Sequence, residues 1–170
     1  MIVKDDVLTE TEIDYFIKNK NKMYEISKFQ YPKVHYWDKK KKKNFFNEFL
    51  DLLFEKKLIK DTWSTYEYWM NPTTNGKLPW HKDKDEYYYK FFNKVINPSM
   101  SCVFYFDVNC VGGELIIKMP DEDLTVKPEK NRLVMFDCSY THKVNPFTGD
   151  RIALSINLWS KKPPSLSLNL

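Results

Sequence analysis

Short segments rich in aromatic and β-branched residues follow one another from residue 61 onward, with turn signals between them. The candidate strands are 62–70, 77–83, 101–108, 114–119, 124–128, 132–137, 142–145 and 151–159. All four glycines lie between these strands, where glycine favours tight turns. This pattern indicates an antiparallel sandwich or barrel, because each short strand can pair with a neighbour through a simple turn.

Two helices are predicted before the strands. Thr9 is suited to cap the first helix, and Glu12, three residues later, completes a capping box. The second helix is indicated within 44–60, where apolar residues form a wide stripe along one helical face. We expect both helices to pack on the outside of the strands.

The length of the chain limits the number of domains. A chain of 170 residues with 42% hydrophobic content buries one sizeable core but is short for two. We expect one domain over 1–170, with helical support over about 1–60, a strand-rich core over about 61–160 and a tail over about 161–170.

The charge and the first residues narrow the classes of partner. A formal net charge of +4 does not by itself require a nucleic acid or an anionic membrane. The N-terminal residues show no signal-peptide pattern, and no window approaches the roughly 18 apolar residues of a membrane span. The three cysteines have no close metal-type spacing. We therefore expect a cytoplasmic protein with reduced thiols and no membrane partner.

A His-x-Asp pair, His81 and Asp83, stands in an otherwise ordinary charged segment. Taken alone, the pair is typical of a polar loop. His142, at the start of a predicted strand, supplies a second imidazole, and Arg151 follows nine residues later. Two imidazoles and one carboxylate provide the three-ligand face of a non-haem iron site, which leaves coordination positions open for other molecules.

Four stretches, "HKD", "YFD...VGGELII", "THKV" and "RIALS", occur in this order between about residues 63 and 159. In order and spacing they resemble the iron(II)- and 2-oxoglutarate-dependent dioxygenases, most closely the prolyl 4-hydroxylase-like branch. The resemblance implies a mainly β fold with flanking helices, the double-stranded β-helix, which is a jelly-roll or cupin-like barrel. It also implies Fe(II), 2-oxoglutarate and O2 as cofactor and cosubstrates, with ascorbate in a supporting role.

The resemblance assigns roles to individual residues. His81, Asp83 and His142 become the catalytic iron ligands, and Arg151 binds the distal carboxylate of 2-oxoglutarate. Arginine suits this role because its planar guanidinium donates two parallel, charge-assisted hydrogen bonds to a carboxylate.

Two further residues are assigned to the cosubstrate pocket by the same resemblance. Tyr105 matches a tyrosine whose hydroxyl reaches the cosubstrate carboxylate, and Ser155 matches a hydroxyl position in the same pocket. In an extended strand, every second residue from Arg151 to Asn157 shares one face, and the residues between them are apolar. We expect the more polar face to point into the barrel.

The sequence departs from related patterns at two positions. Some branches carry Arg-x-Ser at the cosubstrate arginine, whereas this chain has Ala153, so a hydroxyl must come from Ser155. Nucleic-acid demethylases resemble one another in a second arginine six residues after the first, where this chain has Asn157. A nucleic-acid substrate is therefore disfavoured.

The activity implied is hydroxylation of an unactivated C–H bond with release of succinate and CO2. A peptidyl prolyl residue is the substrate that we favour, while a free amino acid or another small metabolite stays open. A cupin-like metal-binding protein, or a binding module without turnover, is the alternative class. The sequence leaves the oligomeric state undetermined.

The segment 84–98 between Asp83 and the next strand is long and rich in aromatic residues. We predict a substrate-facing loop, in which Glu86 to Phe92 closes over the iron and helps to select the substrate. The alternative is that the segment only covers an exposed sheet edge.

Overall fold

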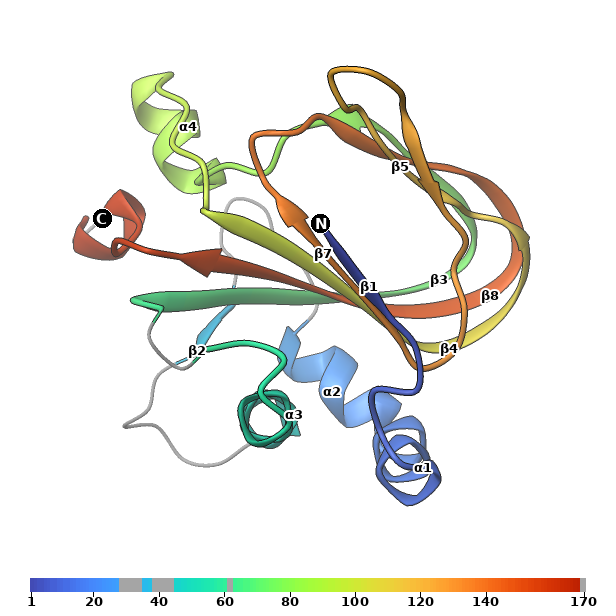
Figure 1. Cartoon of the computed structure of the whole chain (residues 1–170). Helices are drawn as coiled ribbons and strands as arrows, with labels where there is room; N and C mark the ends of the chain where they lie inside the picture. The colour runs from blue at the N-terminus through green and yellow to red at the C-terminus, as the bar shows by residue number, and fades with distance from the viewer. Residues whose placement is uncertain (28–34, 38–44, 61–62, 169–170) are drawn as a thin grey trace.

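One strongly curled antiparallel sheet dominates the computed structural model (Figure 1). The structure describes residues 1–27, 35–37, 45–60 and 63–168. Within these ranges the sheet contains eight strands in the order β1-β7-β4-β8-β3-β2, while β5 pairs with β6 and β8. The strands are β1 Ile2–Lys4, β2 His35–Trp37, β3 Thr65–His81, β4 Met100–Gly112, β5 Leu115–Ile117, β6 Leu124–Val126, β7 Arg132–Asp137 and β8 His142–Trp159.

Two pairs of predicted strands are each one long strand. The predicted strands 62–70 and 77–83 merge into β3, and 142–145 and 151–159 merge into β8. The pairing of β3 with β8 shifts register on both sides of Gly76. Because β8 also pairs with β5 near its start, the curled sheet folds over on itself into a barrel. The predicted mainly β architecture with flanking helices is confirmed.

Helices α1 (Glu10–Lys18), α2 (Lys20–Ser27) and α3 (Phe45–Glu55) lie on one side of the sheet (Figure 1). The predicted capping box is present, since Thr9 Oγ1 accepts from the backbone N–H of Glu12 at 3.3 Å and Glu12 accepts from the N–H of Thr9 at 2.7 Å. The sequence analysis did not predict α2.

The helices and the sheet enclose an aromatic core. Phe49 of α3 packs against Phe16 of α1 and Phe104 of β4, with ring centroids 5.5 and 4.9 Å apart. A second apolar cluster fills part of the barrel and includes Ile117 and Phe136. The helical core therefore supports the sheet from outside, while the second cluster shapes the interior.

The segment 84–98 contains a helix, α4 (Glu86–Phe92), so the prediction that the whole segment is a loop is wrong. Asp85 caps α4 through its carboxylate, which accepts from the backbone N–H of Tyr88 at 2.9 Å, and Asn93 ends the helix in the left-handed conformation. In Figure 1, α4 stands beside the end of the barrel at which β3 ends and β8 begins. Every helix within the described ranges falls short, in length or in apolar content, of what a membrane span requires.

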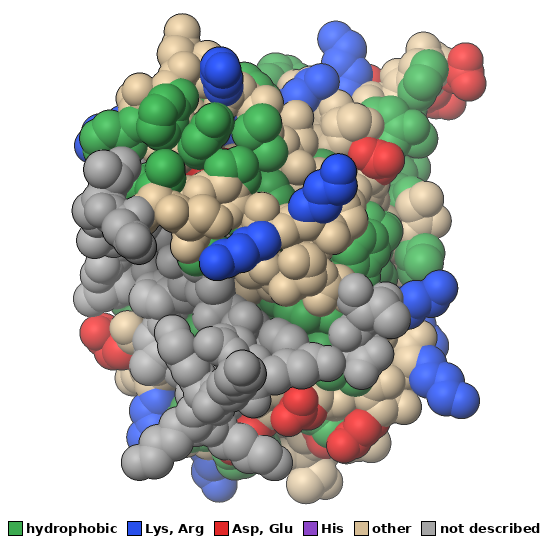
Figure 2. Space-filling view, turned by 90° about the vertical axis from the view of Figure 1, so that its left-hand side faces the viewer, with side chains coloured by type: hydrophobic (Ala, Val, Ile, Leu, Met, Phe, Trp, Pro, Cys, Tyr) green, Lys and Arg blue, Asp and Glu red, His purple; other side chains and the backbone are tan. Residues whose placement is uncertain are grey.

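Apolar side chains on α4 and the residues after it are exposed. They are Tyr89, Phe91, Phe92, Val95 and Ile96. Figure 2, which views the side on which α4 projects, shows hydrophobic side chains gathered at the height of α4 with lysine or arginine side chains near them. We call these five residues the α4 apolar surface. The 3-10 helix η1 (Pro164–Ser167) docks beside α4, because the N–H of Ser165 donates to the Asp85 carboxylate at 2.9 Å.

Candidate metal centre

His81, Asp83 and His142 meet at one end of the barrel. His81 is the last residue of β3 and His142 is the first residue of β8, and their Cα atoms are paired in the ladder. One ligand atom from each of the three residues lies within 4.8 Å of the others. The Nε2 atoms of both histidines are 3.8 Å from oxygens of the Asp83 carboxylate. The fold thus brings together the three ligands proposed from the sequence.

Backbone carbonyls orient both imidazole rings. His81 Nδ1 lies 2.9 Å from the carbonyl oxygen of Pro79, and His142 Nδ1 lies 3.3 Å from that of Tyr140. A carbonyl only accepts, so each Nδ1 carries a proton and donates it. In its neutral form, each ring with this tautomer presents the lone pair of Nε2 toward Asp83, as metal binding requires.

Burial also favours a neutral His142. Removal of the ring from water lowers the pKa of His142, and the nearby His81 lowers it further, while Asp83 opposes the shift. The side chains of His142 and Asp83 are 7% and 9% exposed, whereas that of His81 is 29% exposed. Access from solvent to the centre is therefore on the His81 side.

Arg151 and Tyr105 provide buried donors in the same cavity. The Arg151 guanidinium lies 4.7 Å from the ring centroid of Phe147 and 5.7 Å from that of Tyr105, and its Nη1 donates to the carbonyl of Gly113 at 3.2 Å. Its Nε and the Tyr105 hydroxyl are buried, and neither has a hydrogen-bond partner among the described residues. Buried polar atoms are rarely left in this state, so this pair indicates a place for an acceptor such as a carboxylate.

Arg151 and Tyr105 both keep their protons, so both can donate hydrogen bonds to an anion. Burial raises the pKa of Tyr105 to about 12, so its hydroxyl keeps its proton and can donate. Burial lowers the pKa of Arg151, yet a guanidinium stays charged at any physiological pH.

Strand β8 presents its residues as the alternation predicted. Arg151, Ala153, Ser155 and Asn157 line the cavity that also contains the three candidate ligands. The intervening residues, Ile152, Leu154, Ile156 and Leu158, lie in the core beneath the helices. Ser155 therefore belongs to the cavity, as expected.

The sequence analysis missed two buried polar residues near the candidate ligands, and one of them, Ser101, contacts a ligand directly. Ser101 of β4 donates from its hydroxyl to Asp83 Oδ2 at 2.5 Å. Glu67 of β3 is buried; its Oε2 lies 3.1 Å from the side-chain amide of Asn157 and accepts from Trp159 Nε1 at 3.1 Å. The only sequence signal was a carboxylate inside an aromatic strand, and no local pattern marked Ser101.

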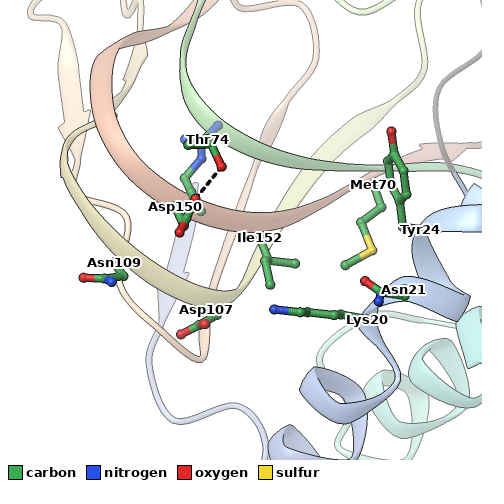
Figure 3. A pocket seen from close by; sticks show the side chains of 10 residues that line it. Lys20, Asn21, Tyr24, Met70, Thr74, Asp107, Asn109, Asp150 and Ile152 are labelled. Carbon is green, nitrogen blue, oxygen red and sulfur yellow. Dashed lines mark hydrogen bonds between the residues drawn. The ribbon is translucent and has the colours of Figure 1, made fainter.

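A larger pocket of about 310 Å³ lies on the helix side of the sheet (Figure 3). Lys20 and Asn21 of α2 face Asp107 of β4 across it, and Thr74 donates a hydrogen bond to Asp150 at its edge. Of its charged lining residues, Lys20 and Asp150 are exposed and Asp107 is half-buried, while the buried Arg151 also lines the barrel cavity. Among the described residues, the metal-type cluster lies only in the barrel cavity, so we place the chemistry there.

Solved structures with this fold include three prolyl hydroxylases. A Pseudomonas putida prolyl-4-hydroxylase has a TM-score of 0.69 and 15% identity, with 94% of this chain and 92% of that chain covered. A Trichoplax adhaerens prolyl hydroxylase, solved with a hypoxia inducible factor oxygen degradation domain peptide fragment, has a TM-score of 0.67 and 15% identity, with coverages of 99% and 87%. A Phytophthora capsici prolyl 4-hydroxylase has a TM-score of 0.58 and 19% identity, with coverages of 96% and 60%.

At these low sequence identities, the structural similarity shows the fold alone, and that fold is the expected double-stranded β-helix. A search of curated proteins found no match. Residues 64–161 match the family model of the 2OG-Fe(II) oxygenase superfamily, and this range holds the three candidate metal ligands, Arg151 and Tyr105. Because the match spans more than half of the chain and includes the whole candidate site, the chain belongs to the 2OG-Fe(II) oxygenase superfamily.

Proposed function

We propose that this oxygenase hydroxylates a prolyl residue in a peptide, with iron bound by His81, Asp83 and His142 and with 2-oxoglutarate anchored by Arg151. One observation carries the site assignment. Three ligand atoms within 4.8 Å of one another share a cavity with two buried donors that have no partner among the described residues. Membership of the family favours an oxygenase over the cupin-like metal-binding alternative.

The side chains of the candidate site fit both iron and 2-oxoglutarate. Two neutral imidazoles and one carboxylate are ligands that Fe(II) accepts while keeping open positions. The charged guanidinium of Arg151 and the Tyr105 hydroxyl supply hydrogen bonds to a carboxylate inside a buried, partly aromatic site. Together, bound iron, 2-oxoglutarate and O2 supply the oxidising chemistry, with succinate and CO2 as products.

The protein residues position and shield these groups. Pro79 and Tyr140 hold the imidazole rings through their carbonyls, and Ser101 holds the Asp83 carboxylate. Apolar side chains line the same cavity and limit the entry of water, including Leu115, Phe136 and Val144. Arg151 is fixed by Gly113 and Phe147, so its contact with a carboxylate requires little rearrangement.

The peptide part of the proposal is supported by the position of α4. The N–H of Asp85 donates to the carbonyl of Ile96 at 2.8 Å, and Asn97 donates from its side chain to the carbonyl of Asp83 at 2.5 Å. These bonds anchor the base of the α4 segment directly at a candidate ligand. The α4 apolar surface thus projects beside the site, where aromatic rings can pack against a proline ring. Structural neighbours of the chain include prolyl hydroxylases, one of them solved with a peptide.

A substrate panel tests this proposal. Succinate formation is measured with Fe(II), 2-oxoglutarate and ascorbate in the presence of proline-containing peptides, matched peptides with alanine in place of proline, and free amino acids. We expect only the prolyl peptides to stimulate turnover and to gain one oxygen atom by mass spectrometry. If only free amino acids stimulate turnover, the substrate is a small metabolite and the proposal of a peptidyl substrate is wrong.

We infer that ascorbate sustains turnover by keeping iron reduced, and omission of ascorbate should shorten the linear phase of succinate formation.

We also infer a cytoplasmic location, which is supported by the free state of Cys102, Cys110 and Cys138. Cell fractionation tests the location, and recovery of the protein in a secreted fraction would contradict it.

A further inference from the structure

A chain of buried polar contacts leads from Asp83 to Glu67. Ser101 Oγ lies 2.5 Å from Asp83 Oδ2 and 3.1 Å from the side-chain amide of Asn157. The other end of this amide lies 3.1 Å from Glu67 Oε2. Glu67, Asn157 and Ser101 are paired residues on the adjacent strands β3, β8 and β4, and each is 2% exposed. Because the three residues lie in one row across the sheet, their spacing is set by the strand register.

The number of available protons determines the direction of each hydrogen bond between Asp83 and Glu67. A carboxylate that binds a metal only accepts hydrogen bonds, so Ser101 gives its single hydroxyl proton to Asp83. Asn157 must then present its NH2 group to Ser101. A half-turn of the amide achieves this, because it exchanges the oxygen and nitrogen without moving other atoms. The amide oxygen of Asn157 then faces Glu67 Oε2, and this contact needs a proton on Glu67.

The surroundings of Glu67 favour its protonated form. The pKa of Glu67 is raised to about 8, mainly by burial and also by the carboxylates of Asp83 and Asp85, against the hydrogen bonds with Asn157 and Trp159. Trp159 Nε1 donates to the same Glu67 oxygen at 3.1 Å. A hydroxyl oxygen can accept from the indole while it donates to Asn157, so every contact in the chain receives one proton.

We propose that Glu67 is a positioning residue, whose carboxylic acid proton orders the hydrogen-bond chain through Asn157 and Ser101 and thereby fixes the carboxylate of Asp83 for metal binding. The proposal rests on the proposed role of Asp83 as an iron ligand. Loss of an outer partner of a ligand typically lowers metal affinity about ten- to a hundredfold. Glu67 acts only through the chain, since it contacts neither the metal ligands directly nor the cosubstrate donors in the described residues.

Titration of apo protein with Mn²⁺ tests whether the hydrogen bonds between Glu67 and Asp83 affect metal affinity. Glu67→Gln loses the acceptor for Trp159 but keeps a neutral donor toward Asn157, so we expect its Mn²⁺ affinity to stay within about threefold of the natural protein near pH 6.5. Glu67→Met and Ser101→Ala break the chain and should bind Mn²⁺ about ten- to a hundredfold more weakly. Above pH 8 the natural protein should bind more weakly than Glu67→Gln. Ser99→Ala is the matched control, because that hydroxyl bonds Ser160 and not Asp83.

An infrared spectrum near pH 6.5 tests the proton directly, even where Glu67→Met does not fold. The natural protein should show the carbonyl band of a buried protonated carboxylic acid, and this band should be absent from Glu67→Gln. Its presence in both proteins, or in neither, overturns the proposal.

Asp83→Ala separates this inference from the proposed function. Unchanged Mn²⁺ binding in Asp83→Ala overturns the assignment of the metal ligands. Loss of binding in Asp83→Ala together with unchanged binding in folded Ser101→Ala and Glu67→Met overturns only the role of Glu67.

Discussion

His81 and His142 are paired across the β3–β8 ladder, and their ring centroids lie 4.2 Å apart. One residue ends its strand and the other begins its strand, so the backbone of both is held by the sheet. Asp83 lies two residues beyond the end of β3 and completes the cluster. A metal site built on strand ends in this way is preorganised, because little backbone motion is needed to gather the ligands.

The cluster predicts one divalent metal per chain. Calorimetric titration of apo protein should give a stoichiometry near one, and Asp83→Ala should nearly abolish turnover. Because affinity rises from Mn²⁺ and Fe²⁺ toward Ni²⁺ and Cu²⁺, purified protein should be stripped of adventitious metal first. An unchanged stoichiometry in the His81→Ala, His142→Ala double variant contradicts the site.

Arg151→Met should weaken 2-oxoglutarate binding and spare the metal. Charge-assisted hydrogen bonds contribute on the order of 1.5 to 3 kcal/mol, which corresponds to roughly tenfold to more than a hundredfold in affinity. Calorimetry with the Mn²⁺-loaded protein measures this effect. Arg132→Met is the matched control, because Arg132 pairs with Asp5 and Glu129 outside the cavity. Equal cosubstrate affinities in the two variants would place the anchor elsewhere.

Tyr105→Phe should have opposite effects on cosubstrate binding and on the apo protein. The change removes a buried hydroxyl that has no partner among the described residues, so the thermal stability of apo protein should stay equal or rise. The same change removes a donor to the cosubstrate carboxylate, so KM for 2-oxoglutarate should increase about tenfold. Melting curves and steady-state kinetics measure the two effects, and an unchanged KM excludes Tyr105 from the cosubstrate site.

The α4 apolar surface should matter for the substrate and not for the iron. Tyr89→Ala with Phe91→Ala should reduce turnover stimulated by a prolyl peptide, while slow uncoupled decarboxylation of 2-oxoglutarate continues. Val111→Ala is the control for loss of an exposed apolar side chain, since Val111 is 79% exposed and Phe91 is 52% exposed. Equal loss of both rates at a temperature where the variant is folded indicates that α4 only supports the fold.

The raised pKa of Glu67 predicts a pH dependence of stability. The unfolded chain releases the proton near the ordinary pKa of 4.5, whereas the folded protein retains it up to about 8. Protonation therefore stabilises the folded state at low pH, and this contribution is lost as the pH rises through about 8. The melting temperature of apo protein should fall relative to that of Glu67→Gln between pH 6 and 9. Parallel curves for the two proteins would contradict the shift.

Local sequence patterns determined several features of this protein. The capping box at Thr9 and Glu12 depends on residues three positions apart, and the two faces of β8 depend on alternation within one strand. Likewise, the spacing of His81, Asp83, His142 and Arg151 indicated the family, because those residue types carry the chemistry. The cap and the strand alternation are set by neighbours along the chain, and the order and types of the four site residues can be read without the tertiary fold.

Only the tertiary structure decided the supporting contacts. The merging of predicted strands into β3 and β8 requires continued pairing through irregular positions, and α4 is stabilised at its start by Asp85, which also binds η1. Ser101 reaches Asp83 over 18 positions in sequence, and Asn157 reaches Glu67 over 90. These contacts depend on the register between strands that are distant in sequence. A shift of one residue turns each side chain to the other face of the sheet, so the chain of contacts at Asp83 exists only once the sheet has formed.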